Sequence, residues 1–236
     1  MKRLLAVLAV AGLALTAGCL GPGAVDEAAL SEPATYDWNT SETASVTIEG
    51  GQYQAVLTLQ NRTNVSLFGP DAFGGRAALP ISAVQYRFPN GSVVNASGLS
   101  VSERDERTVI QVPEAGGKVA YTAAVTANSL YLPVAVNGSH SVTLPEGTDV
   151  QAPIVGRARP GGFERVAVDD RVTLVWENPT TEIVTVDYYT ERNLYIFAAV
   201  LALGVLIAGA GVAYYKRQLR ALAAERAAVS PEEEER

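Results

Sequence analysis

Cysteine and histidine are almost absent from this chain of 236 residues, which contains one of each, Cys19 and His140. A lone cysteine cannot form a disulfide bond within the chain, so the stability of an exported domain would come from its packed core. One cysteine and one histidine also cannot supply the ligands of a zinc or copper site. We therefore expect neither a metal nor a cofactor.

Lysine is scarce too, with three residues against fifteen arginines. Residues 20–190 carry 19 acidic and 10 basic side chains, a balance of −9 in a chain whose net charge is −7. Nucleic-acid binding requires a basic face, so we expect no nucleic-acid partner. An acidic, lysine-poor exported part suggests a salt-loving host, and an ordinary acidic surface domain is the alternative.

Catalytic motifs are missing as well. His140 lies between Ser139 and Ser141, but a catalytic triad needs a base that a third group orients, and neighbours on a strand point to the opposite face. Asp169 and Asp170 lack the spacing of a calcium loop, and the glycine pairs that begin at positions 74, 116 and 161 lack the residues of a phosphate-binding loop. We expect no catalytic residues and no enzymatic activity. A hydrolase without a recognisable motif would need a serine, an aspartate and His140 in one pocket.

The long stretch without charge covers residues 194–215. A helix of that length rises about 33 Å, enough to cross about 30 Å of hydrocarbon, and this predicts one transmembrane helix within residues 191–215. Basic residues follow it closely, at Lys216, Arg217 and Arg220. The positive-inside rule therefore predicts a single-pass protein of the cell membrane, with residues 216–236 as a cytoplasmic tail. Helical composition continues to Val229, which favours an extension of the helix by about three turns.

Small residues recur at a spacing of four within the apolar stretch, where they would lie on one face of the helix and let another helix approach. They are Ala198 and Ala202, Gly204 and Ala208, and Gly209 and Ala213. The ordinary small-residue content of a membrane helix explains them equally well.

Residues 1–19 read as an export signal. Lys2 and Arg3 precede an apolar run, and small residues at 17 and 18 precede Cys19 in the arrangement of a lipobox. Cleavage before Cys19 would leave a lipidated N-terminus in the membrane. An uncleaved signal anchor and a non-lipid cleavage nearby are the alternatives. Residues 20–35 are rich in Gly, Pro and Ala, which indicates a linker.

Residues 36–190 alternate between apolar and polar side chains in short runs that turn residues separate. Tyr53, Ala55 and Leu57, for example, share one face of their run. About ten such strands predict an extracellular all-β domain, an antiparallel sandwich of one or two modules. If there are two modules, the boundary falls between positions 127 and 138.

Glycosylation sequons are the strongest positive signal. Chance predicts about one N-x-[ST] match in this composition. Six are present, and their candidate asparagines are Asn39, Asn61, Asn64, Asn90, Asn95 and Asn137. All six lie in the predicted extracellular domain. Clustering of Asn and Ser in β-turns is the alternative explanation.

Several stretches together carry a resemblance to a known family. They are the sequences YDWNT at 36–40, RFPNGSVVNAS at 87–97, RPGGFE at 159–164, DYY at 187–189 and RNLYIF at 192–197. The chain resembles a haloarchaeal family of single-pass membrane proteins of unknown function that bear a lipobox. The resemblance implies a β-rich outer domain, one C-terminal helix and a short cytoplasmic stub, and it brings no activity or catalytic residues.

The sequence thus predicts a membrane-anchored (lipo)protein of the cell envelope, with an outward-facing β-domain in a structural or recognition role. Its partners would be membrane lipid and another envelope or membrane protein. The alternative is an accessory subunit of a transport or secretion complex that docks through its helix.

Overall fold

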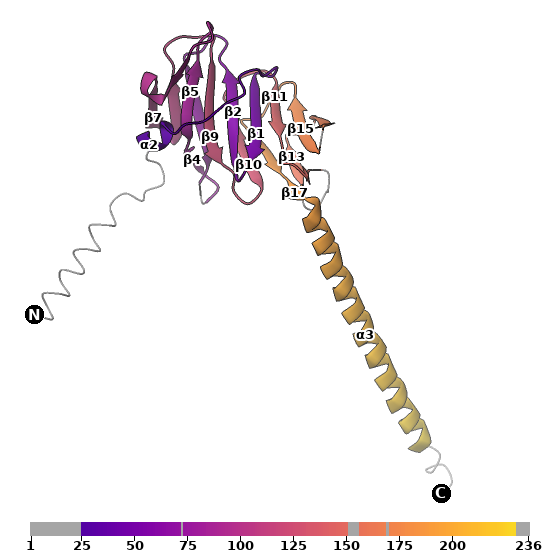
Figure 1. Ribbon diagram of the computed structural model, residues 1–236. Coiled ribbons are helices and arrows are strands. Elements are labelled where there is room, and N and C mark those ends of the chain that lie inside the picture. The colour runs from indigo at the N-terminus through magenta and orange to yellow at the C-terminus, as the bar shows by residue number, and fades with distance from the viewer. Residues whose placement is uncertain (1–24, 72, 151–155, 169, 230–236) are drawn as a thin grey trace, which may run out of the picture. The chain divides into compact units, whose positions relative to one another are not determined.

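A computed structural model describes residues 25–71, 73–150, 156–168 and 170–229 (Figure 1). The predicted signal segment, with Lys2, Arg3 and Cys19, lies outside the described residues, as do Asp169 and the last seven residues of the tail. The chain divides into two compact units, Met1–Tyr188 and Tyr189–Arg236. We call the described part of the first unit the β-domain.

The larger layer of the β-domain is an eight-stranded sheet with the order β14-β15-β11-β1-β2-β9-β5-β6. Neighbouring strands run antiparallel except β1 and β11, which are parallel, with Ala44 opposite His140. The strands are β1 (Ala44–Glu49), β2 (Gln52–Thr58), β5 (Ser82–Arg87), β6 (Val93–Asn95), β9 (Lys118–Ala124), β11 (His140–Thr143), β14 (Glu164–Val168) and β15 (Arg171–Trp176).

Two smaller sheets share a core with the large one. One has the order β4-β3-β8-β7 and the other the order β10-β16-β13. Their strands are β3 (Asn64–Pro70), β4 (Arg76–Ala78), β7 (Ser100–Arg104), β8 (Arg107–Gln111), β10 (Ser129–Pro133), β13 (Arg157–Arg159) and β16 (Ile183–Asp187). The short elements η1 (Ala96–Gly98) and β12 (Thr148–Asp149) lie in connections. The predicted β-sandwich is confirmed, with one parallel pair in an otherwise antiparallel set.

One buried cluster unites the layers. It contains Tyr53 and Tyr121 from the large sheet, whose rings meet edge to face with centroids 6.0 Å apart. It also contains Leu67 from β3 and Val186 from β16. Because side chains from before position 127 and after position 138 join the same cluster, the β-domain is one module. Apolar burial of this kind is the main term that holds a domain without disulfides together.

The segment interpreted as a linker is docked on this module from Val25 onward. Residues 27–30 form the short helix α2 (Glu27–Leu30), and the carboxylate of Asp26 caps it by accepting from the backbone N–H of Ala28. Leu30 is 5% exposed and belongs to the core cluster. Four residues are too few to show a helical period, so the sequence pattern gave no sign of this helix.

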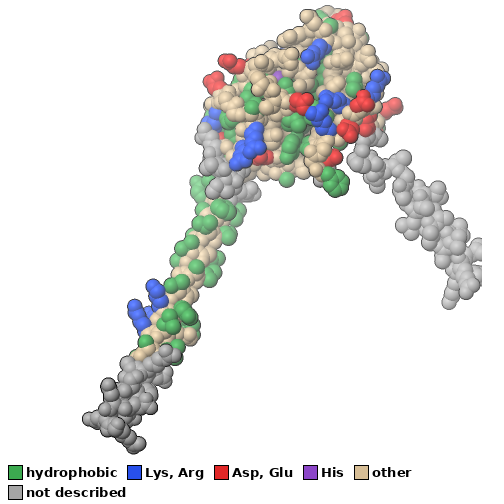
Figure 2. Space-filling view, turned by 180° about the vertical axis from the view of Figure 1, so that it is seen from behind, with side chains coloured by type: hydrophobic (Ala, Val, Ile, Leu, Met, Phe, Trp, Pro, Cys, Tyr) green, Lys and Arg blue, Asp and Glu red, His purple; other side chains and the backbone are tan. Residues whose placement is uncertain are grey.

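The second unit contains β17 (Tyr189–Thr190) and the long helix α3 (Glu191–Val229). The apolar part, Leu194–Ala224, is the one helix among the described residues that is long and apolar enough to cross a membrane. The predicted helix and its extension to Val229 are therefore confirmed. Figure 2 shows basic side chains on α3, whose sequence carries Lys216, Arg217 and Arg220 after the uncharged stretch 194–215.

Candidate functional site

The two chain ends of the β-domain lie at one end of the sandwich. Val25 and Asp26 line a pocket together with the β1–β2 turn at Gly50 and Gly51. The backbone N–H of Val125 donates to Gly51 O at 2.9 Å, which places the β9–β10 turn beside the β1–β2 turn. The N–H of Tyr188, the last residue of this unit, donates to Asn128 O in the β9–β10 turn at 3.0 Å. We call this end, with the turns at 50–51 and 125–128, the terminal edge.

The opposite end is formed by the loops at 39–43, 59–63, 88–92 and 134–139. The strand registers fix it, because β2 runs from Gln52 at the terminal edge to Thr58 at this end, opposite Lys118. Lys118 Nζ in turn donates to the carbonyl of Trp38 at 2.9 Å, which ties the loop before β1 to the same end. We call it the sequon edge.

Five of the six candidate glycosylation asparagines lie at or next to the sequon edge. Asn95 is the exception, since it lies on β6 opposite Gln85, away from either end of that sheet. All six asparagines are exposed. The five are Asn39 in the loop before β1, Asn61 and Asn64 around the β2–β3 turn, Asn90 in the β5–β6 turn and Asn137 in the loop before β11. The strand topology thus gathers sequons that are up to a hundred residues apart, without bringing them near the chain ends.

Local turn chemistry accounts for part of the sequon count. Asn90 Oδ1 accepts from the backbone N–H and the hydroxyl of Ser92, at 2.9 and 2.8 Å. Asn95 Oδ1 accepts from the N–H and hydroxyl of Ser97 in the same way, at 3.3 and 2.7 Å. These are Asx turns, in which Asn and Ser are favoured for conformational reasons alone. The other four sequons show no such pair of bonds between the Asn side chain and its own Ser or Thr.

The terminal edge also holds an open pocket of about 370 Å³. Much of its lining is apolar, from Val25, Leu79, Pro80 and Ile81 among others. The polar side chains that line it are Asp26, Gln52, Ser82, Thr108 and Thr122. The hydroxyl of Thr108 is engaged, because it donates to Leu79 O at 2.6 Å. The apolar part of this lining suits a small apolar group.

His140 is buried on β11. Its Nδ1 lies 2.9 Å from Gly138 O, and because a carbonyl only accepts, Nδ1 carries the proton. Burial lowers the pKa of His140, and the Gly138 carbonyl partly opposes that shift. The Ser139 hydroxyl accepts from the N–H of Thr43, and the Ser141 hydroxyl donates to Ser45. The structure therefore does not bring these three neighbours together.

Other candidate positions have structural roles. Gly74, Gly116 and Gly162 have positive φ in turns, as does Asp170 at +60°. No three His, Cys, Asp or Glu side chains of the described residues gather as a metal site. Figure 2 shows acidic and basic side chains interspersed over one face of the β-domain. The small residues of α3, namely Ala198, Ala202, Gly204, Ala208, Gly209 and Ala213, are exposed along that helix.

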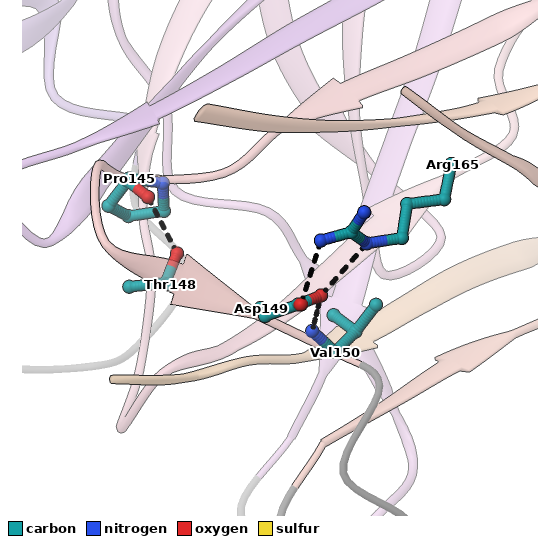
Figure 3. Close-up of polar contacts among 5 residues, drawn as sticks. All are labelled: Pro145, Thr148, Asp149, Val150 and Arg165. Atoms are coloured by element: carbon teal, nitrogen blue, oxygen red, sulfur yellow. Dashed lines mark hydrogen bonds and ion pairs between the residues drawn. The ribbon is translucent and has the colours of Figure 1, made fainter. Parts of the chain in front are cut away.

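An ion pair joins the segment after β11 to β14. No sequence pattern indicated this contact. The carboxylate of Asp149 accepts from Arg165 Nε at 3.2 Å and from Arg165 Nη2 at 2.8 Å (Figure 3). Asp149 Oδ1 also accepts from the N–H of Val150 at 2.7 Å. The hydroxyl of Thr148, the residue before Asp149, donates to Pro145 O at 2.7 Å. Only the fold could reveal the pair, because its partners lie on β12 and β14.

The sequence patterns also did not single out the exposed apolar residues of the terminal edge. Phe73, in the turn between β3 and β4, is 99% exposed, and Val168, beside the β14–β15 turn, is 62% exposed. Phe73 precedes the pair Gly74–Gly75, and an aromatic side chain within a glycine turn is the signal that could have found it.

A family model matches residues 40–234, and its description is a family of unknown function, DUF5803. The chain belongs to this family. The matched region spans both the β-domain from Thr40 onward and α3. No curated protein and no solved structure matches the chain. The resemblance to a family of unknown function is confirmed at that level.

Proposed function

We propose that this DUF5803 protein is a non-enzymatic protein of the cell envelope, anchored in the cell membrane by α3. Its β-domain faces outward and serves a structural role or recognises another envelope component. Residues 1–19 are the export signal, and Cys19 is the site of a second, lipid anchor. The host is haloarchaeal, as the lysine-poor composition and the family resemblance suggest.

The observation that carries this proposal is the separation of the two edges of the β-domain. Both chain ends leave from the terminal edge, whereas five exposed sequon asparagines lie at the opposite edge or next to it. A domain tethered to a membrane at one end would carry its sugars and meet its partners at the other. The basic residues that follow the uncharged stretch 194–215 support an outward-facing β-domain through the positive-inside rule.

Glycopeptide mass spectrometry on the protein from its own host tests the outward orientation. We expect sugar on one or more of Asn39, Asn61, Asn64 and Asn137, the sequon-edge asparagines that have no Asx turn with their own Ser or Thr. Crosslinking on intact cells then tests the recognition role. An envelope component captured through the β-domain would support that role, and a protein that carries neither sugar nor a crosslinked partner would contradict the proposal.

The alternative is an accessory subunit of a membrane transport or secretion complex. The exposed small residues that recur at a spacing of four along α3 favour it, because they let a second helix pack closely. Purification in a mild detergent separates the two functions. A stoichiometric partner with several membrane helices, lost when Gly204 and Ala208 are both replaced by Leu, would favour the alternative.

A further inference from the structure

We propose that the hairpin between β3 and β4 is a membrane-contacting element, which places the ring of Phe73 in the interfacial layer of the bilayer that α3 crosses. The inference rests on the membrane anchoring proposed above. It adds a specific contact between the β-domain and lipid, which neither the apolar helix nor the family match implies.

The hairpin turn is built to hold Phe73 outward. Asp71 Oδ1 accepts from the N–H of Phe73 at 2.8 Å and from the N–H of Gly75 at 2.6 Å. The backbone closes the same turn, since Asp71 N donates to Gly75 O at 3.0 Å. Gly74 has φ of +82°, a conformation that glycine adopts without strain. These hydrogen bonds join Asp71 to Phe73 and Gly75, while the Phe73 side chain is 99% exposed.

The base of the hairpin is fixed to the sandwich. The ring of Phe68 is buried, with the guanidinium carbons of Arg76 and Arg107 lying 4.9 and 4.8 Å from its centroid. Arg76 also forms an ion pair with Glu182. Cation–π contacts of this kind hold the start of β4, at Arg76, against β3. A tip that projects from a fixed base keeps its position relative to the terminal edge.

The hairpin lies at the terminal edge. In Figure 1 the turn between β3 and β4 extends from the same end of the β-domain as the β9–β10 turn. The chain between β4 and β5 lines the pocket there with Gly50 and Gly51. Val168, the next most exposed large apolar residue of the β-domain, lies beside the β14–β15 turn, which strand registers place at this end too.

Chain length keeps this edge near the membrane. Six Cα steps separate Tyr188 from Leu194, where the apolar segment begins. A fully extended chain of that length spans about 20 Å, which bounds the separation however the two units are turned. The covalent chain therefore holds Tyr188, at the terminal edge, within about 20 Å of the start of the apolar segment.

The exposed Phe73 ring is better suited to contact lipid than to bind a protein partner. A protein interface needs a contiguous patch of several hundred Å², and a lone ring on a two-strand turn offers much less. Single aromatic side chains instead settle readily at membrane–water interfaces, where they bury part of their surface among the headgroups. A second ring is not required for such a contact.

Quenching of tryptophan fluorescence by brominated lipid tests the contact. The full-length protein is reconstituted in vesicles of phosphatidylcholine and phosphatidylglycerol, with bromine on the upper part of the acyl chains. Phe73→Trp introduces the probe at the hairpin, and Val93→Trp is the matched control, because Val93 is 47% exposed and lies beside the β5–β6 turn at the sequon edge. The unsubstituted protein supplies the background from Trp38 and Trp176.

We expect the added emission of Phe73→Trp to shift to shorter wavelength and lose intensity in brominated vesicles, while that of Val93→Trp keeps its intensity. Equal quenching at both positions, or none at position 73, would overturn the inference. Flotation of the vesicles separates this result from the proposed anchoring. Protein that floats with an unquenched Phe73→Trp contradicts the hairpin contact alone, and protein that does not float contradicts the anchoring and the hairpin contact together.

Discussion

The backbone N–H of Tyr188 donates to the carbonyl of Asn128 at 3.0 Å, across sixty residues of sequence. This bond fixes the last residue of the β-domain to the turn between β9 and β10. Its neighbour, the bond from Val125 to Gly51, joins that turn to the β1–β2 turn and so to the pocket that Val25 lines. Three segments distant in sequence thus bring both chain ends to one edge.

That arrangement gives the β-domain a defined polarity. Hydrogen bonds join the turns at the terminal edge to one another. The sequon edge, by contrast, carries loops with exposed asparagines. In the proposed function, a membrane attachment at the terminal edge leaves the sequon edge free for sugars and partners.

Stability should depend on pH through His140. Its pKa in the folded state is below the ordinary value of about 6.5, because burial disfavours the charged imidazole. Below about pH 6.5 the unfolded chain binds a proton that the folded chain does not, so stability falls as pH falls and levels off above that pH. We expect a slope of up to about 1.4 kcal/mol per pH unit below pH 6.5.

Urea unfolding of the detergent-solubilised protein between pH 5 and 7.5 measures this slope. His140 is the sole histidine, and ordinary carboxyl groups titrate below this range, so the window isolates it. In His140→Asn, whose amide can still donate to Gly138 O, the slope should vanish. A slope that survives this substitution would mean that another group is responsible.

The ion pair of Asp149 and Arg165 should contribute more to the free energy of unfolding than the exposed ion pair of Arg76 and Glu182. Arg165 and Asp149 are 28% and 19% exposed and share two hydrogen bonds, so Asp149→Asn should cost about 1–3 kcal/mol in the free energy of unfolding. The side chains of Arg76 and Glu182 are 45% and 68% exposed, so Glu182→Gln should cost less than about 1 kcal/mol.

Denaturant midpoints of the two variants, each in low and high salt, check this order. Salt should change the effect of Glu182→Gln more than that of Asp149→Asn, because exposed charges are screened more strongly. The reverse order of costs would show that the bidentate contact does not fix β12 to β14 as described.

Gly117 is a position where the sandwich tolerates no side chain. A Cβ there would overlap the hydroxyl of Tyr86 and the backbone carbonyl of Arg87. Gly117→Ala should therefore cost about 2 kcal/mol or more. Gly161→Ala is the matched control, since its Cβ would meet nothing within 4 Å, and it should change stability by less than about 0.5 kcal/mol. Equal melting temperatures for the two variants would refute the close packing of the β8–β9 turn against β5.

Lipidation is predicted at Cys19, from the lipobox arrangement of residues 16–19. Cys19→Ser should remove the mass of the acyl chains from the N-terminal peptide while α3 still holds the protein in the membrane fraction. Intact mass spectrometry of both proteins from the same host provides the comparison. An N-terminal mass that does not change on substitution would favour an uncleaved signal anchor or a non-lipid cleavage.

Sequence patterns predicted the elements better than their arrangement. The apolar run of α3 and the alternation of Tyr53, Ala55 and Leu57 in β2 are local signals, because burial of a helix or of one sheet face imposes them on consecutive residues. The parallel pairing of β1 with β11 has no local signal, since nothing near Ala44 records that His140 will lie beside it.

The same limit applies to the candidate sites. Each sequon was visible as a three-residue motif, but their meeting at one edge follows from strand order and register. The docking of α2 depends on few apolar residues, Leu30 and the nearby Val25, in a segment whose composition indicates a linker. Burial of His140 likewise depends on its partners across the sheet, Ala44 and Trp176.

Labelling of introduced cysteines on intact cells tests the orientation most directly. Val93→Cys places a thiol beside the sequon edge, and Ala223→Cys places one on α3 beyond Arg220; both positions are exposed, and the unsubstituted chain gives the background of Cys19. With a maleimide that cannot cross membranes, we expect Val93→Cys to react on intact cells and Ala223→Cys to react only after lysis. Reaction of Ala223→Cys on intact cells with protection of Val93→Cys would contradict the outward-facing β-domain.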